Sequence, residues 1–226
     1  MRRYEAASLL PDLSISQAAH VAPAIALFEN ATCALARGTL IASIRGPVAI
    51  EDLLPGDYIQ THRGPECVLW IGSCTYAPNR DPLEDDPMHL TRVMSDAFGP
   101  SRPMGHLLAG PAAAIRQERP AMRHSGLSGS FITPLSDYVD GDRVIEVTPP
   151  SPVQLYHLAL ARHAIIRAAG VEVETYHPGP HAGADIGPNT RAVFLSMFQH
   201  VSDFADFGDL AFPRASRARL DRLSVA

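Results

Sequence analysis

The chain has 226 residues, of which 46% are hydrophobic and 19% charged, and a formal net charge of −5. This composition is ordinary for a globular protein and excludes a disordered chain. The sequence has no Lys/Arg block and no run of about 18 apolar residues, so neither nucleic acid nor a membrane is an expected partner. Its opening segment does not read as a secretory signal, and we therefore expect a cytoplasmic protein.

The first half of the chain predicts an all-β meander. Residues 1–32 show little periodicity and are interpreted as a poorly anchored arm with one short helix. From Gly38, short aliphatic runs alternate with Gly-Pro and Pro-Gly-Asp turns about every ten residues. The strands that this pattern predicts lie at 39–44, 47–50, 57–61 and 66–72.

Further short strands are expected in the second half. The acidic, Pro-rich stretch 76–89 is predicted to be a solvated loop. Weak patterns follow at 90–95, 106–110, 113–116 and 142–147, and a stronger passage predicts strands at 152–160, 163–168 and 171–176.

The C-terminal segment has a helical pattern. Five apolar residues recur at helical spacing and predict a stripe that faces the core, namely Val193, Phe194, Met197, Phe198 and Val201. A second helical pattern covers 215–224. The fold class predicted for the whole chain is therefore mainly β, with a short helical C-terminal segment.

Three cysteines, Cys33, Cys67 and Cys74, are too few for a disulfide framework, and their spacing matches no zinc ribbon or CxxC motif. Cys67 and Cys74 are interpreted as small buried hydrophobes. No cofactor and no metal are expected.

Two blocks of sequence resemble the hedgehog/intein (Hint) family, and within it the bacterial branch. Residues 34–41, Ala-Leu-Ala-Arg-Gly-Thr-Leu-Ile, and 46–57, Gly-Pro-Val-Ala-Ile-Glu-Asp-Leu-Leu-Pro-Gly-Asp, are similar to its opening block. The Tyr-His-Leu sequence at 156–158, continued through His163 to Ala-Gly-Val at 169–171, is similar to its closing block. The resemblance implies a Hint fold of many short strands.

Self-processing in this family implies a Cys or Ser in the opening block that attacks its own upstream carbonyl. Counted back from Gly38, that position is Ala34, and Cys33 stands one residue too early. Adjacent strand residues point to opposite faces, so Cys33 should face away from the site unless a β-bulge restores its direction. Cys33 remains a candidate nucleophile.

The resemblance also implies an internal histidine that polarises the scissile amide, in a Ser-Pro-x-His motif. The segment 107–113 keeps the proline but has Ala113 at the place of the histidine, and His106 stands seven residues earlier. In the closing block, His163 keeps the family position and His157 replaces an aspartate. We predict that His157 and His163 face one another across a shallow pocket, and both are candidate catalytic residues.

Splicing is not expected, because the resemblance implies a terminal His-Asn whose carboxamide cyclises and this chain has Glu174-Thr175 instead. Whether the chain is an enzyme stays open, with single-turnover self-cleavage as the most that the residues allow. We predict a degenerate autoprocessing module that serves as a scaffold or binding domain. The alternative is an active N–S acyl shift and cleavage near Cys33.

Two other site types were compared with this prediction. Gly-Leu-Ser-Gly-Ser at 126–130 fails as a hydrolase nucleophile elbow at its last position. His177 and His181 have the i, i+4 spacing of helical zinc motifs, but Pro-Gly-Pro at 178–180 forbids a helix there. A metal site in this loop is the remaining alternative.

The sequence is divided into an N-terminal arm (1–32), the Hint domain (33–180) and a helical extension packed on it (181–226). An unidentified protein or the chain's own N-terminal segment is the expected partner of the domain.

Overall fold

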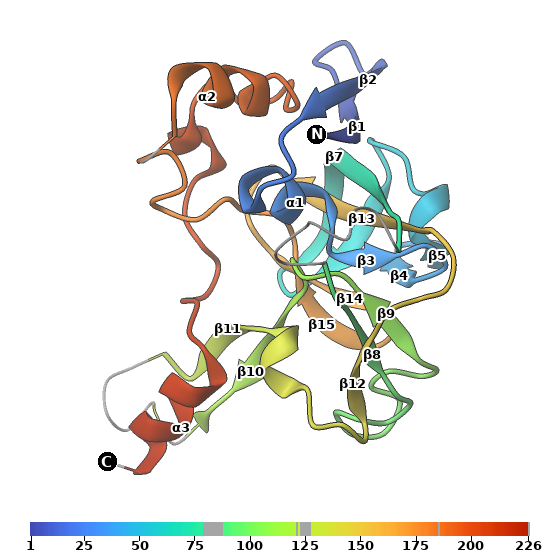
Figure 1. Ribbon diagram of the computed structural model, residues 1–226, viewed down its shortest axis with the longest axis vertical. Helices are drawn as coiled ribbons and strands as arrows, with labels where there is room; N and C mark the ends of the chain where they lie inside the picture. Colours follow the sequence, from blue (N-terminus) through green and yellow to red (C-terminus); the bar gives the residue numbers. More distant parts are fainter. Residues whose placement is uncertain (79–87, 121, 123–127, 185, 226) are drawn as a thin grey trace.

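The computed structural model describes residues 1–78, 88–120, 122, 128–184 and 186–225. The fifteen strands among these residues are joined in one sheet system, and every pairing between them is antiparallel. Figure 1 shows strands through most of the molecule, with helices α2 and α3 at its edges. The predicted fold class, mainly β with a short helical C-terminal segment, is confirmed.

The strands are β1 (Arg2–Leu9), β2 (Ile15–Ala22), β3 (Leu35–Ala36), β4 (Leu40–Ser43), β5 (Gly46–Ala49), β6 (Tyr58–Thr61), β7 (Gly64–Tyr76), β8 (Leu90–Val93), β9 (Leu107–Ala109), β10 (Ala114–Glu118), β11 (Ser130–Pro134), β12 (Val144–Val147), β13 (Val153–Leu160), β14 (Ile165–Ala168) and β15 (Val171–Glu174). The α-helices are α1 (Ala26–Thr32), α2 (Pro188–Leu195) and α3 (Arg217–Val225), and the described 3₁₀ turns are η1 (Ile50–Asp52), η3 (Leu135–Tyr138) and η4 (Phe204–Phe207).

The centre of the molecule is the pair formed by β7 and β13. The 13-residue strand β7 pairs with β13 from Tyr76 to Val68, with β6 at its start and with β1 along its other edge. A register shift at Ala159/Leu160 bends this pair. The two faces of this pair contribute to two hydrophobic cores, since Ile71 and Leu158 belong to one and Trp70 and Ala159 to the other.

We call the two cores the sheet core and the aromatic core. The sheet core is aliphatic and includes Ala34, Ile41, Ile59, Val68, Ile71, Leu107, Ala113, Leu158 and Val173. The aromatic core includes Tyr4, Phe28, Cys33, Trp70, Cys74, Tyr176, Phe194, Phe198 and Phe207. It joins the N-terminal hairpin, β7 and the segment from Phe194 to Phe207, so the N-terminal hairpin and this part of the C-terminal extension share one interior.

Trp70 shows why β7 needs a glycine two residues later. Its ring stacks on Phe198 at 4.3 Å between centroids, and its Nε1 donates to the Met197 carbonyl at 2.6 Å. Residues i and i+2 share a face of a strand, and a Cβ on Gly72 would lie 2.0 Å from the indole. Only glycine leaves room for this ring.

The interpretation of residues 1–32 as a poorly anchored arm is wrong. Residues 2–22 form a hairpin, and β1 also pairs with β7 from Tyr4↔Cys74 to Ser8↔Trp70. Alternate residues of β1 are buried, but apart from Tyr4 they are polar or small and have low β-propensity. This composition hides a strand from a search for aliphatic alternation. The one expected short helix is α1.

From residue 39 onward, the strands that the sequence predicts correspond to β4 to β10 and β12 to β15, and most bounds agree within two residues. The exception is β7, which extends to Tyr76. Strands β3 and β11 were not predicted. Residues 79–87 of the expected loop lie outside the described residues.

The C-terminal stripe packs as predicted at four of its five positions. Phe194, Met197, Phe198 and Val201 are buried, while Val193 is 38% exposed because α2 ends at Leu195 and turns follow it. From α2 the chain runs along one side of the molecule to α3 (Figure 1). None of the described helices has the length and apolar character needed to cross a membrane.

The packing of the C-terminal extension on the N-terminal part can be tested at Phe194. Its ring contacts Phe28 of α1 at 5.8 Å between centroids. We expect Phe194→Ala to lower the free energy of unfolding by about 3–5 kcal/mol through the lost contacts and the cavity left behind. The matched control Val193→Ala, at the exposed neighbouring position, should cost under about 1 kcal/mol. Urea unfolding curves of both variants measure the difference, and equal costs would contradict the packing.

Candidate functional site

The site begins where α1 ends and the chain enters β3. The Cys33 N–H donates to the Glu29 carbonyl and closes the helix, and the Ala34 N–H donates to the Tyr156 carbonyl of β13 at 3.1 Å. Both side chains are fully buried, but Cys33 lies in the aromatic core and Ala34 in the sheet core. The two adjacent side chains therefore point to opposite sides of the chain, as the sequence predicted.

A second main-chain segment clamps the same two residues. The Ala112 N–H donates to the Cys33 carbonyl at 3.1 Å, and the Gly110 N–H donates to the Ala34 carbonyl at 2.9 Å. A Cβ on Gly110 would lie 2.2 Å from the Cys33 oxygen, so this close approach requires glycine. The Cys33 carbonyl, which precedes position 34, is thus bound by the Ala112 N–H. The next residue, Ala34, carries only a methyl group and has no side-chain atom that could attack this carbonyl.

The Cys33 thiol is enclosed. Its Sγ lies 2.7 Å from Cys74 Sγ and 3.4 Å from Thr32 Oγ1. Burial, together with the hydrogen bond to Cys74, raises the pKa of Cys33 well above its ordinary value. A thiol in this state is a poor nucleophile.

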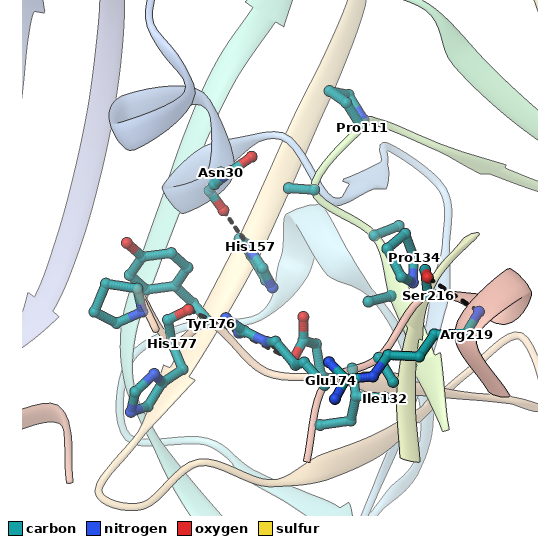
Figure 2. A pocket seen from close by; sticks show the side chains of 16 residues that line it. Asn30, Pro111, Ile132, Pro134, His157, Glu174, Tyr176, His177, Ser216 and Arg219 are labelled. Atoms are coloured by element: carbon teal, nitrogen blue, oxygen red, sulfur yellow. Dashed lines mark hydrogen bonds and ion pairs between the residues drawn. The ribbon is translucent and has the colours of Figure 1, made fainter. Parts of the chain in front are cut away.

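His157, on β13, is buried at the wall of a cavity. Its Nδ1 donates to the Asn30 carbonyl of α1 at 2.9 Å, so in the neutral ring Nε2 is the acceptor. Burial lowers the pKa of His157 to about 4. Nε2 makes no direct hydrogen bond of good geometry with the described residues, although the Glu174 main chain lies near it. Figure 2 shows the ring between Asn30 and Glu174.

His163 belongs to a different cluster, so the predicted pocket with His157 and His163 facing one another is not formed. Its Nδ1 accepts from the Ala211 N–H at 3.0 Å, which directs the Nε2 proton to Glu174 Oε2 at 3.2 Å. Its ring lies 5.3 Å from that of His177. His163 therefore holds Glu174 in place and does not itself line the cavity.

Glu174 connects this cluster to the C-terminal segment. Arg214 donates to Glu174 Oε2 at 3.1 Å and to the His177 carbonyl at 2.8 Å. Burial opposes the charged carboxylate, but His163 and Arg214 outweigh it and lower the pKa of Glu174. Sequence reasoning missed Glu174 and Arg214 as site residues, because nothing in the sequence indicates that positions 40 apart meet.

Thr175 occupies the place expected for the terminal asparagine. Its Oγ1 accepts from the Ala164 N–H at 3.0 Å and donates to the Ala164 carbonyl at 3.2 Å. Because the side chain is fully buried and both of its hydrogen-bonding roles are satisfied, it serves to join β14 and β15.

These elements enclose a cavity of about 440 Å³ (Figure 2). Its lining comes from α1, the turn before β10, β11, β13, the end of β15 and the C-terminal segment, and consists of Asn30, Pro111, Ala112, Ala113, Ala114, Ile132, Pro134, His157, Glu174, Tyr176, His177, Pro178, Arg214, Ala215, Ser216 and Arg219. We call this cavity the alanine pocket. No cysteine is among its described lining residues.

The structure gives no catalytic or metal-binding arrangement to the other candidates that it describes. His106 is exposed. Both ring nitrogens of His177 bind main chain, since Nδ1 accepts from Gly179 and Nε2 donates to Gly208, which leaves neither free for a metal. Gly126 and Leu127 of the hydrolase-like motif lie outside the described residues.

Known proteins resemble this chain as follows. A family model described as the Hint domain matches residues 33–180. A crystal structure of the gp41-1 intein aligns with a TM-score of 0.40 and 11% identity, over 64% of this chain and 99% of that chain. The solution structure of a bacterial intein-like domain from Clostridium thermocellum aligns with a TM-score of 0.40 and 13% identity, over the same shares. No curated protein sequence matches the chain.

The burial of His157 predicts a pH dependence of stability. Its pKa is about 4 in the folded chain and about 6.5 when unfolded, so between these values only the unfolded chain binds the proton. The stabilisation is therefore complete above pH 6.5 and falls by about 3 kcal/mol as the pH drops to 4. His157→Gln cannot titrate and should show a shallower fall. Burial also lowers the pKa of His177 and His200, so a residual slope will remain.

Urea unfolding of the wild type and of His157→Gln between pH 4.5 and 7 measures this contribution. If the free energy of unfolding fell with pH by the same amount in both proteins, His157 could not be buried in its neutral form.

Proposed function

The chain belongs to the Hint domain family, and on that premise we propose that it is a Hint module that neither splices nor cleaves itself and acts as a scaffold or binding domain. In the family, the nucleophile would stand at position 34 and the amide-polarising histidine at position 113. Both positions carry alanine, and both methyl groups lie in the sheet core.

The observation that carries this proposal is the direction of the Cys33 side chain. Its sulfur contacts Cys74 and Thr32 Oγ1 in the aromatic core. The carbonyl that the Ala112 N–H binds is that of Cys33, the one that a nucleophile at position 34 would attack, whereas Cys33 itself would have to attack the Thr32 carbonyl. An N–S acyl shift needs a thiolate and a nearby base. The pKa of Cys33 is raised, and the Nδ1 of His157 is already bound to Asn30.

The end of the domain supports the same conclusion for splicing. Cyclisation requires a free carboxamide at the last position, and Thr175 has only a hydroxyl, which is bound to Ala164. Glu174 is held by His163 and Arg214. A side chain fixed in this way stabilises the structure and has no freedom to attack.

The N-terminal segment fits the role of a partner that stays covalently attached to the domain it packs on. Strand β1 adds to the edge of β7, and Tyr4 stacks on Phe28 at 5.6 Å between centroids within the aromatic core. Segments that a self-cleaving module releases do not need to be part of its interior. We infer that residues 1–32 remain attached as a built-in strand pair and helix.

The alanine pocket is the binding surface that we propose for the scaffold. Ala112, Ala113 and Ile132 give it an apolar wall, and His157 Nε2 supplies an acceptor without a good partner among the described residues. A buried acceptor favours a ligand that can donate an N–H or O–H. The chemistry therefore fits a small ligand or peptide end with an apolar group beside an amide or hydroxyl donor.

Intact mass under denaturing conditions tests the absence of cleavage. After a day with or without dithiothreitol, the wild type and Cys33→Ala should each remain one species of about 24.3 kDa. Denaturation is needed because the hairpin and α1 would stay bound after a cut at Cys33. Loss of residues 1–32 that thiol accelerates and Cys33→Ala abolishes would instead establish the self-cleavage alternative.

Titration with N-acetyl-leucine N-methylamide, which has two N–H donors and an apolar side chain, tests the pocket. We expect saturable NMR shifts of the Ala112 and Ala113 amides in the wild type. His157→Phe keeps a ring but loses the acceptor, and should weaken binding roughly fivefold. His200→Phe replaces a histidine that does not line the pocket and should bind as the wild type does. Equal affinity of all three proteins would exclude the proposed role of His157.

A further inference from the structure

Cys33 and Cys74 come from distant segments and meet in the aromatic core. Cys33 follows α1 and Cys74 lies on β7, 41 residues later, yet their sulfurs are 2.7 Å apart and neither is exposed by more than 1%. The sequence offered no reason to pair them. Cys67, the third cysteine, points elsewhere, with its sulfur 3.6 Å from the Val68 carbonyl.

The surroundings give the two thiols different chemical roles. The hydrogen bond from Cys33 lowers the pKa of Cys74 against the opposing effect of burial, and the Thr32 hydroxyl and the Arg2 guanidinium act in the same direction. Burial raises the pKa of Cys33. Because the thiolate is the reactive form, Cys74 is the more nucleophilic of the two and Cys33 carries the proton.

Access also favours Cys74. It lines a surface cavity of about 180 Å³ together with Arg2, Arg3, Thr75 and Gln154. Cys33 is not among the described lining residues of that cavity and lies behind Cys74. A small oxidant that enters it therefore meets Cys74 first.

We propose that Cys33 and Cys74 form a redox modification site that closes to an intramolecular disulfide when the protein meets a small hydroperoxide. The Cys74 thiolate attacks the terminal peroxide oxygen and the O–O bond breaks. The other oxygen departs as hydroxide, or as an alkoxide from an organic hydroperoxide, and takes a proton to become water or an alcohol. Cys74 is now a sulfenic acid. The Cys33 sulfur attacks the Cys74 sulfur, and the sulfenic hydroxyl leaves as water with the Cys33 proton. With hydrogen peroxide, two thiols are oxidised and the peroxide is reduced to two waters.

The disulfide would join the end of α1 to β7. Helix α1 also supplies the Asn30 carbonyl that binds His157, so the bond fixes one wall of the alanine pocket to the central strand. This inference is independent of the proposed binding role, because the two thiols lie in the aromatic core and do not line the alanine pocket.

Oxidation of the purified full chain with hydrogen peroxide tests the site. After quenching, denaturation and alkylation with N-ethylmaleimide, peptide mapping should show a Cys33–Cys74 cross-link and alkylation of Cys67 alone. The matched control Cys67→Ser should form the same cross-link. In Cys33→Ser, Cys74 should accumulate as a sulfenic acid that dimedone traps.

Three results would overturn the proposal. They are a disulfide that includes Cys67, conversion of wild-type Cys74 to the sulfinic acid without a cross-link, and survival of both thiols unchanged. Because the bond would close a 41-residue separation, the oxidised wild type should also melt roughly 5–10 °C above the reduced protein. Dithiothreitol should reverse this rise, and Cys33→Ser should show none.

Discussion

The rest of the structure depends on how the chain passes between its two cores at residues 33 and 34. Main-chain hydrogen bonds from both sides, from Ala112 and Gly110 and to the Tyr156 carbonyl, fix the direction of this segment. With the backbone fixed, the Cys33 side chain can only enter the aromatic core and the Ala34 side chain the sheet core. A shift by one residue would exchange the two. The chemistry available on each side is therefore set by which residue occupies each position.

The C-terminal extension completes the site that the β domain begins. Its segment around Arg214 runs beside β11, where the Ile132 N–H donates to Pro213 and the Ala215 N–H to Ile132, each at 2.9 Å. Arg214 then pairs with the buried Glu174, a charge that would be costly without a partner. The extension thus forms a wall of the alanine pocket in addition to packing on the aromatic core.

Local sequence patterns predicted the elements that carry strong local signals. Aliphatic alternation and Gly-Pro punctuation located β4 to β7, and the two family-like blocks directed attention to Cys33, His157 and His163. Strand β1 escaped because its buried residues are mostly small or polar. The partners Cys74 and Arg214 also escaped, because contacts over 40 residues depend on sheet register and chain path, which no short window contains.

The same dependence on main-chain hydrogen bonds explains why the fold tolerates alanine at positions 34 and 113. The clamp on Cys33 uses N–H and C=O groups that every non-proline residue carries, so alanine at positions 34 and 113 leaves it intact. Small side chains fill the sheet core there, and the methyl groups of Ala112, Ala113 and Ala114 line the pocket where longer side chains would occupy space. Under the proposed function, the alanine at position 113 both lacks the polarising imidazole and leaves space in the cavity. The proposed binding role depends on the apolar wall of this cavity and on the Nε2 of His157.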